Sequence, residues 1–524
     1  MPASTQESSE PAAPGTIAPA DGSRLEAVKA SSQDEVHAAV KAARAAQAEW
    51  GATPLSVRAE HCKRLAQLVL ERRDEVLEIM SSETGRSTTE CLMSELATLP
   101  TYVAGAIGEA KRALKPQKVG LSSLEYPGKR AVIEQLPRGV VAIIAPWNYP
   151  LGNFYKHMFP ALLSGNGLVL KPSEYTPRTG AWLAERCAEA FPTGLVGLAQ
   201  GGGEVGAWLL ESGIDAVTFT GSVATGRKVA AKAGELLIPA SVELGGKDAA
   251  IVLEDCDLER TAVGIAQWGI HNCGQNCAAI ERVFVLEPIA DDFVARLGSV
   301  MKKLRVAPEE SSELGPLQSA QQLAIVEDHV ANALDLGATL VTGGERVGEG
   351  LGYRPTLLDH CTNEMLVMTD ETFGPLLAVT RVANEEEAVK RANASDYGLN
   401  GSVWTKNVAR GERLARQLQV GVALVNNHGI TGVIPQTPWT GVKNTGAGVA
   451  GSRFAYHTFA RPRTVFVDKS SKPDPWWFPA NPDLQSLGDA LVARGQGSFG
   501  ALFTLAGLVG KRVKAIKALG SSGG

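Results

Sequence analysis

The chain has 524 residues, with 51 basic and 56 acidic side chains and a net charge of −5. This length predicts roughly two to three domains of ~150 residues each. Hydrophobic residues make up 44% of the chain and charged residues 20%, which is ordinary for a soluble protein with large cores and argues against a mainly disordered, collagen-like or coiled-coil chain. The slight excess of acidic residues argues against a protein that binds nucleic acid through bulk positive charge.

Cysteine content and the N-terminus bear on the cellular compartment. Seven cysteines at irregular spacing do not resemble a disulfide framework, so we expect a reducing, cytoplasmic environment. Residues 1–22 are expected to form a flexible tail, and their start lacks the basic and apolar regions of a secretion signal. No run of 18 uninterrupted apolar residues occurs, so no membrane-spanning helix is expected.

The first ordered elements are two amphipathic helices. Ser32 and Glu35 have the spacing of a Ser-x-x-Glu capping box, which predicts the start of the first helix. Apolar residues then recur at steps of three or four over residues 36–50, as on one face of a helix. A second apolar stripe over residues 65–80 predicts a helix that ends near Gly85.

From residue 139 onward, short apolar runs alternate with helix-like segments. Apolar runs at such intervals, separated by helices, are typical of βαβ units and a parallel sheet. Two such series predict an α/β fold with two doubly wound domains, the first with the pattern of a nucleotide-binding domain. The runs are 139–146, 167–172, 194–199 and 216–220 in the first series, and 249–253, 283–286, 339–342 and 377–380 in the second.

The domain boundaries follow from this pattern. Two segments outside the series, 121–136 and 455–468, alternate apolar and polar side chains and predict strands that belong to neither sheet. The predicted parts are a tail at 1–22, a first α/β domain at 23–120 and 137–243, a second α/β domain at 244–440, the two outlying strands, and a C-terminal extension at 469–524.

A glycine-containing turn follows the run at 216–220. Gly221 lets the backbone turn, and the free N–H groups of a helix that begins near Ser222 can face a phosphate. Gly226 lets that helix approach a ligand or a strand closely. On its own this pattern is more often that of an ordinary βα turn, because it is neither a Walker loop nor a strict G-x-G-x-x-G fingerprint.

Polar residues follow two other predicted strands, at the strand ends where open α/β sheets bind ligands. Lys171 and Glu174 could hydrogen-bond the ribose hydroxyls of a dinucleotide, although a surface ion pair has the same pattern. Asn148 lies between Pro146 and Pro150, which fix the backbone so that its amide could donate to a developing oxyanion. The alternative is a turn in which the asparagine caps a backbone group.

Two further residues carry candidate reactive groups. Glu243 precedes Leu-Gly-Gly, and burial there would raise its pKa toward neutrality and make it a usable base; otherwise it caps a helix or pairs with Lys247. Cys277 becomes a nucleophile only if a helix N-terminus or a cation lowers its pKa, and otherwise is an inert buried cysteine. His271, Cys273 and Cys277 lack a fourth ligand at a recognised spacing, so no metal site is predicted.

Taken together, seven segments in one order resemble the aldehyde dehydrogenase superfamily over roughly residues 20–468. Each segment alone is a weak signal, but the ordered set, with Cys277 34 positions after Glu243, is very specific. The segments are Pro146-Trp-Asn-Tyr-Pro150, Lys171-Pro-Ser-Glu174, Phe219-Thr-Gly-Ser222, Glu243-Leu-Gly-Gly-Lys247, Gly274-Gln-Asn-Cys277, Glu371-Thr-Phe-Gly-Pro375 and Gly441-Val-Lys443.

The resemblance implies an NAD-binding domain, a catalytic domain and a small strand-rich oligomerisation region, to which 121–136 and 455–468 would belong. It implies an oxidoreductase that converts an aldehyde to the carboxylic acid with NAD, or with NADP as the alternative cofactor. It also implies a homodimer or homotetramer.

The resemblance also assigns roles to residues. Cys277 would attack the aldehyde to give a thiohemiacetal and then a thioester, Asn148 and the Cys277 backbone N–H would stabilise the oxyanion, and Glu243 would activate the hydrolytic water. Glu174 would favour NAD because a carboxylate repels a 2′-phosphate. Lys171 and Glu174 would hold the adenosine ribose, Ser222 the pyrophosphate, Glu371 the nicotinamide ribose and Phe373 the ring. The full cofactor set is Trp147, Lys171, Ser173, Glu174, Gly221, Ser222, Gly226, Leu244, Glu371 and Phe373.

Three features depart from the family pattern. His157 stands where many members have lysine, and Lys156 where several have a bulky aromatic residue that lines the substrate site. These departures leave the substrate open among medium aliphatic aldehydes, aromatic aldehydes and semialdehydes. The extension ends in an apolar run, 501–509, followed by four basic residues within 511–517, which predicts either a membrane-surface helix or a helix docked on the protein body.

Three rival functions make different predictions. An acylating relative would pass the acyl group to coenzyme A or phosphate and needs no water-activating base, so Glu243 argues for hydrolysis. A cysteine hydrolase would cleave esters without producing NADH. A catalytically silent member would not need Cys277, Glu243 and Asn148 together.

Overall fold

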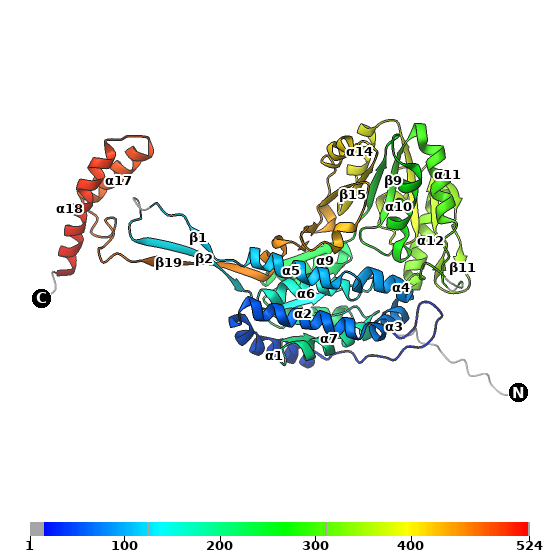
Figure 1. Ribbon diagram of the computed structural model, residues 1–524, viewed down its shortest axis with the longest axis horizontal. Coiled ribbons are helices and arrows are strands. Elements are labelled where there is room, and N and C mark those ends of the chain that lie inside the picture. Colours follow the sequence, from blue (N-terminus) through cyan, green and yellow to red (C-terminus); the bar gives the residue numbers. More distant parts are fainter. Residues whose placement is uncertain (1–14, 123–125, 308, 310–311, 522–524) are drawn as a thin grey trace. The chain divides into compact units, whose positions relative to one another are not determined.

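The computed structural model describes residues 15–122, 126–307, 309 and 312–521. These residues form two compact units (Figure 1). The main unit covers the described residues up to Lys115 and Gln135–Arg461, and the second unit covers the described residues of Pro116–Glu134 and Pro462–Gly524. Of the predicted N-terminal tail, residues 1–14 lie outside the described residues, and a bridge between Ile17 and Arg24 closes a turn in the remainder.

The first sheet of the main unit has five parallel strands in the order β5-β4-β3-β6-β7. The chain moves outward from β3 through β4 to β5, and then returns to the other side of β3 for β6 and β7. This reversal creates a switch point between β3 and β6, the place where doubly wound sheets bind ligands. The strands are β3 Val140–Ile144, β4 Gly167–Lys171, β5 Val196–Leu198, β6 Ala216–Gly221 and β7 Ala240–Leu244.

Alternating side chains of the first sheet pack against helices on both faces. Val141 and Ile143 join one core with α2, α3, α5, α6 and α7, whereas Val140 and Ala142 join another with α1, α8 and α9. Apolar residues on both faces explain why the strands have continuous apolar sequences. The helices are α1 Gln33–Ala52, α2 Leu55–Glu71, α3 Arg73–Thr84, α4 Thr88–Cys91, α5 Leu99–Ala113, α6 Gly152–Leu163, α7 Pro177–Ala190, α8 Gly203–Glu211 and α9 Val223–Glu235.

Two predicted helix boundaries, one start and one end, are confirmed in the helices that cover this sheet. Ser32 and Glu35 form the predicted capping box at the start of α1, and Gly85 ends α3 in the left-handed conformation with φ 71°. The single helix predicted over residues 65–80 is wrong, because the chain leaves helical geometry at Arg72, where φ is −113°, and so forms α2 and α3.

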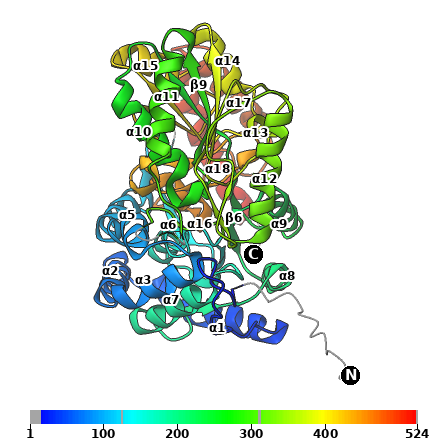
Figure 2. The same cartoon turned by 90° about the vertical axis from the view of Figure 1, so that its right-hand side faces the viewer.

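The second sheet of the main unit has seven strands in the order β10-β13-β14-β9-β8-β15-β16. All neighbouring pairs are parallel except the edge pair β10–β13, which is antiparallel. Helices α10 and α11 cover one face and α12 to α15 the other (Figure 2). The elements are β8 Asp248–Val252, α10 Leu258–Ile270, β9 Ile280–Leu286, α11 Ala290–Met301, α12 Ala320–Asp335, β10 Thr339–Thr342, β13 Thr356–Asp359, α13 Leu366–Thr369, β14 Leu376–Val382, α14 Glu385–Asn393, β15 Asn400–Trp404, α15 Val408–Ala415 and β16 Val422–Val425.

The predicted α/β fold class is therefore confirmed, with both series of strands in largely parallel sheets. The main unit also contains two small antiparallel pairs and a short helix. These elements are β11 Arg346–Val347, β12 Gly352–Tyr353, β17 Trp439–Thr440, β18 Val449–Ala450 and α16 Tyr456–Phe459.

The second unit contains most of a three-stranded sheet, whose strands β2 and β19 run on into the main unit, and a helical pair. The sheet has the order β1-β2-β19, from Gln117–Val119, Lys129–Pro137 and Ala460–Asp468. Strand β2 begins eight residues later than the predicted 121–136 segment, after a turn in which Gly128 has φ 75°, and residues 123–125 lie outside the described residues. Helices α17 Pro482–Gly495 and α18 Ala501–Ser521 pack against each other. No helix among the described residues is long and apolar enough to cross a membrane.

Candidate active site

The first sheet gathers the predicted cofactor residues at the C-terminal ends of its strands. Ile144, the last residue of β3, is level with Lys171 of β4 and Phe219 of β6, and Gly221 of β6 is level with Leu244 of β7. Because the strands are parallel, the loops that follow them emerge at one edge. Segments far apart in the sequence therefore meet there.

A cavity of about 310 Å³ lies beyond this edge. Nine of the thirteen predicted site residues line it, including all three of the predicted catalytic set. The lining residues are Pro146, Trp147, Asn148, Asn153, Thr220, Gly221, Ser222, Glu243, Leu244, Gly245, Cys277, Gln322, Ile325, Glu371 and Phe373.

Four predicted cofactor residues do not line this cavity. Lys171 ends β4, and its buried Nζ donates to the carbonyl of Pro172, 3.1 Å away. Ser173 is buried and Glu174 half-buried in the turn that follows. Gly226 lies in the first turns of α9, where a Cβ atom would come within 2.2 Å of the Leu244 side chain, so this glycine is needed for close packing of helix on strand.

Cys277 lies in a constrained loop between α10 and β9. The loop begins with a 3₁₀ turn, His271–Gly274, in which Asn272 and Cys273 have φ of 55° and 53°. Positive φ is unfavourable for side chains other than glycine, so surrounding contacts must hold the turn. The side-chain amide of Asn272 donates to the carbonyl of Asn148, 2.9 Å away, and its backbone N–H donates to Glu90, 2.7 Å away.

The Cys277 thiol is the one cysteine side chain that lines the cavity, and it is half-buried. Burial raises its pKa to about 12, while the positive charge of Lys156 lowers it. Lys156 itself lies over the ring of Trp439, with Nζ 4.9 Å from the ring centre. The thiol is therefore mostly protonated, and a proton acceptor is needed before it can act as a nucleophile.

Glu243 is buried, and one oxygen of its carboxyl group has no hydrogen-bond partner. Burial raises its pKa to about 7, while Lys156 lowers it. Its Oε1 is buried without a hydrogen-bond partner and lies 3.5 Å from Nε2 of His157, whose own pKa is lowered to about 3 by burial. A carboxylate with a free oxygen and a near-neutral pKa is suited to accept a proton. Neither alternative for Glu243 holds, because it lies within β7 and Lys247 pairs with Glu281 instead.

Asn148 is fixed by hydrogen bonds on both sides of its amide. Its Nδ2 donates to the carbonyl of Gln275, 3.0 Å away, and its Oδ1 accepts from Tyr149 N and from Asn153 Nδ2. An amide nitrogen carries two hydrogens, so one remains available to a ligand in the cavity.

A buried ion pair connects the loops that carry these groups. Lys247 Nζ donates to Glu281, and neither side chain is more than 3% exposed. The Glu281 carboxylate also accepts the backbone N–H groups of Thr372 and Phe373, at 2.9 and 3.0 Å. The pair thus joins the segments that follow Glu243 and Cys277 to the segment that follows Glu371.

Glu371 and Phe373 face the cavity from that third segment. Glu371 Oε1 accepts the N–H of Gly246, 3.0 Å away, and burial raises its pKa to about 8, with the charge of Glu281 acting in the same direction. Phe373 has φ 50° and meets Trp147 edge-to-face, with ring centres 5.6 Å apart. The two rings form an apolar wall of the cavity.

Sequence reasoning missed Glu281 and the lining residues Asn153, Gln322 and Ile325. Glu281 gave one usable signal, since Glu281 and Arg282 interrupt an otherwise apolar strand and a buried charge needs a partner. The others lie on helices whose apolar patterns give no sign of a site.

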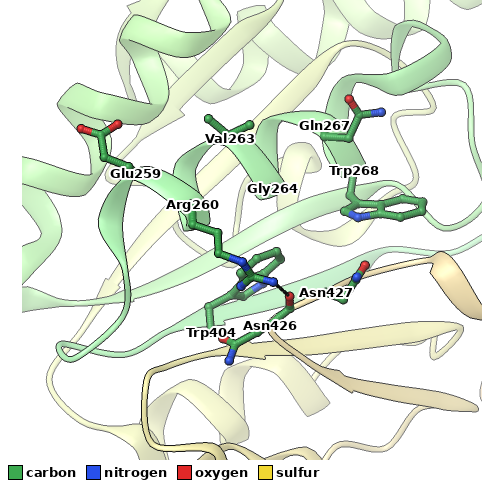
Figure 3. Close-up of a pocket in the computed structure, with 9 residues that line it drawn as sticks. All are labelled: Glu259, Arg260, Val263, Gly264, Gln267, Trp268, Trp404, Asn426 and Asn427. Atoms are coloured by element: carbon green, nitrogen blue, oxygen red, sulfur yellow. Dashed lines mark hydrogen bonds between the residues drawn. The ribbon is translucent and has the colours of Figure 1, made fainter.

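A second pocket, of about 500 Å³, lies beside α10 and contains none of the predicted residues (Figure 3). Arg260 crosses it, lies over Trp404 and donates to the carbonyl of Asn426, 2.8 Å away. No cysteine lines it, and the described residues contain no cluster of three or more His, Cys, Asp or Glu side chains able to hold a metal ion.

The family model for the aldehyde dehydrogenase family matches residues 6–465. The chain belongs to the aldehyde dehydrogenase family. As members of this family, its relatives are oxidoreductases that act on aldehydes, and so is this protein. The match ends before the helical pair of the second unit.

Curated relatives and solved structures agree with this membership. The chain is 35% identical to 4,4'-diapolycopene aldehyde oxidase of Methylomonas sp, over 88% of this chain and 87% of the relative. It is 38% identical to a Mycobacterium ulcerans (strain Agy99) protein named "putative succinate-semialdehyde dehydrogenase (NADP+) 2", over 77% and 79%. A Mycobacterium tuberculosis aldehyde dehydrogenase complexed with NAD+ matches with a TM-score of 0.82 at 33% identity, over 87% and 95%. An aldehyde dehydrogenase from Brucella melitensis biovar abortus 2308 matches with a TM-score of 0.82 at 28% identity, over 88% and 94%.

We predict that Glu281→Gln lowers the free energy of unfolding by about 3–5 kcal/mol, because it leaves the Lys247 ammonium buried without a counter-charge. Urea-induced unfolding measures the change. Glu412→Gln is the matched control, since it removes an exposed pair with Arg416 and should cost no more than about 0.5 kcal/mol. Equal losses in the two variants would contradict the importance of the buried pair.

Proposed function

We propose that the protein oxidises an aldehyde to the carboxylic acid with NAD or NADP, through a thioester on Cys277 that is hydrolysed by water activated by Glu243. The single observation that carries the proposal is that Cys277 and a buried Glu243 with an unpartnered oxygen line one cavity. The names of the relatives, one an aldehyde oxidase and one a semialdehyde dehydrogenase, support the same reaction class.

Formation of the thiolate needs the two groups to cooperate. Burial raises the pKa of Cys277 and so keeps its thiol protonated. Glu243 has a pKa near 7 and can accept that proton within the same cavity. Lys156 assists, because its positive charge favours the ionised form of both groups. The Cys277 sulfur then bonds to the aldehyde carbon, and the carbonyl oxygen becomes an oxyanion.

Asn148 is positioned to stabilise that oxyanion. One N–H of its amide is held by the Gln275 carbonyl, which fixes the plane of the group, and the other can donate to the new charge. The packing of the Cys277 carbonyl on Gly246, where a Cβ atom would come within 2.4 Å, holds the backbone next to the sulfur in place. Pre-positioned donors of this kind need no rearrangement as the charge develops.

The residues at the strand ends fit a dinucleotide. Ser222 caps α9, a 13-residue helix whose N-terminus faces the cavity beside Gly221, which suits a pyrophosphate. Lys171 ends strand β4, two strands away from β6, and Glu174 lies in the turn that follows, where a ribose would extend; Glu371 and Phe373 line the cavity itself. When bound, the nicotinamide group accepts the hydride that leaves the thiohemiacetal carbon.

Hydrolysis then falls to Glu243. The thioester carbon has lost its hydride, so water must attack it and release the Cys277 thiolate together with the carboxylic acid. Glu243 first releases the proton it took from Cys277 to solvent, and as carboxylate it then accepts the proton of that water through its free oxygen. His157, neutral because burial lowers its pKa to about 3, lies 3.5 Å from the same oxygen. An acylating enzyme would not need this carboxylate.

We predict that Glu243→Gln hydrolyses the acyl-enzyme about 10²–10⁴ times more slowly, because no base remains to activate water. The same variant lacks the acceptor for the Cys277 proton, so acylation is also slow near neutral pH and recovers at alkaline pH, where hydroxide removes that proton. Mass spectrometry after mixing at alkaline pH with NAD and a panel of aldehydes should find Cys277 acylated, with a burst of NADH and little turnover. Cys277→Ala, the matched control, should give neither. An unmodified Cys277 would oppose the proposal, and rapid release of an acyl-coenzyme A on adding coenzyme A to the native enzyme would favour the acylating reaction instead.

We predict that kcat increases with pH through about 7 and that Lys156→Met moves this increase to higher pH. Burial has raised the pKa of Glu243 to about 7, so the base is lost as pH falls below that value. Lys156 opposes the effect of burial, and its removal lets the pKa rise further. A pH profile of kcat measures the shift, and Lys156→Arg, which keeps the charge, should leave the profile near its native position.

We predict that Glu174→Ser reduces the preference for NAD over NADP by about tenfold, because the Glu174 carboxylate would no longer repel the 2′-phosphate of NADP. The ratio of kcat/KM for the two cofactors measures the change. Glu204→Ser, on the neighbouring helix α8, is a control that should not alter the ratio. An unchanged ratio in Glu174→Ser would place the 2′-hydroxyl elsewhere.

A further inference from the structure

The helical pair of the second unit is an addition to the family fold with a small core of its own. The family match ends at residue 465, whereas α17 begins at Pro482. Leu487, Ala490 and Leu508 form the buried contact between α17 and α18. So small a core leaves most apolar side chains of the pair outside it.

Large aromatic side chains of this segment are exposed. Phe499, in the turn before α18, and Phe503, in its first turn, are each 85% exposed and lie four positions apart. In the loop that leads into α17, Phe478 is 79% exposed and Trp477 52%. Four aromatic groups in water over so short a segment are unusual for a surface that stays solvated, and they indicate an apolar partner.

The exposed aromatic loop is held in a fixed conformation. Arg512 on α18 is fully buried and donates to the carbonyls of Pro475 and Trp477 and to Oδ1 of Asn481, the residue that caps α17. Beside the loop, Trp476 and apolar side chains of both helices line a cavity of about 830 Å³. Contacts within the second unit therefore hold the loop that carries the tryptophans in one conformation.

Positive charge accompanies the aromatic groups. Residues 496–524 contain four basic side chains and no acidic one, although the chain as a whole has a net charge of −5. The Arg512 side chain is buried in contacts within the unit, whereas Lys511, Lys514 and Lys517 are exposed. Lys514 and Lys517 share the face of α18 that carries Phe503, because they follow it by 11 and 14 positions, close to whole numbers of turns.

We propose that the pair α17–α18 with its aromatic loop binds the surface of an anionic lipid bilayer. Phe499 and Phe503 would enter the interface, the tryptophans would sit at headgroup level, and the lysines would reach the lipid phosphates. Lysines in its second half keep α18 from crossing a bilayer, so it would lie in the plane of the interface. A second copy of this surface is a poorer partner, since its lysines would face lysines.

Vesicle flotation of the full chain tests the proposal. We expect native protein to float with vesicles of phosphatidylcholine and phosphatidylglycerol in a three-to-one mixture, less with phosphatidylcholine alone, and less again at high salt. Lys514→Gln with Lys517→Gln should weaken binding to the anionic vesicles about 25-fold, from about fivefold for each charge. Phe499→Ser with Phe503→Ser should weaken binding to both vesicle types more than tenfold.

Matched controls separate this surface from general charge and hydrophobicity. Lys302→Gln with Lys303→Gln and Val408→Ser change exposed side chains of the main unit and should leave binding unchanged. NADH formation from a soluble aldehyde should be retained in every variant, which makes the test independent of the proposed reaction. Native protein that remains unbound to both vesicles, or a Phe499→Ser/Phe503→Ser variant whose only change is a smaller assembly in sedimentation, would overturn the proposal.

Discussion

The buried ion pair between Lys247 and Glu281 is the interaction on which the candidate site depends. Lys247 follows Glu243 by four residues, and Glu281 follows Cys277 by four, so the pair joins the segments that carry the Glu243 and Cys277 side chains. The remaining lone pairs of the carboxylate hold the backbone beyond Glu371. A buried charge pair of this kind adds little net stability, but loss of one partner leaves a buried charge, so the pair resists separation of the three loops.

Burial then determines the protonation of the ionisable groups that line the cavity. Removal from water raises the pKa of Cys277, Glu243 and Glu371 alike, because each is charged when deprotonated. With the pKa of the thiol near 12 and that of Glu243 near 7, the thiol is protonated at neutral pH whereas Glu243 is partly ionised. Lys156 is the nearby cation that moderates the effect of burial on both.

Much of the fold could be predicted from sequence because the strands are buried on both faces and therefore carry continuous apolar runs. The capping box at Ser32 and the left-handed Gly85 were local signals of the same kind. The break at Arg72 and the antiparallel edge strand β10 could not be predicted, since tertiary packing decides both. Motif order predicted that Cys277, Glu243 and Asn148 belong to one site, and all three line one cavity. The partner of Lys247 was not predicted, because pairing across 34 positions depends on how the strands that follow these two segments align.

The contact between Gly246 and the Cys277 carbonyl limits how this scaffold can be engineered. Replacing a glycine with alanine usually reduces the freedom of the unfolded chain and so favours the native state, but at Gly246 the added methyl group would collide with the main-chain carbonyl of Cys277. Helix glycines with open space around them, such as Gly108 in α5 and Gly234 in α9, offer the same entropic gain without that collision. Heat tolerance is therefore best introduced in the peripheral helices, leaving the turn between β7 and β8 as it is.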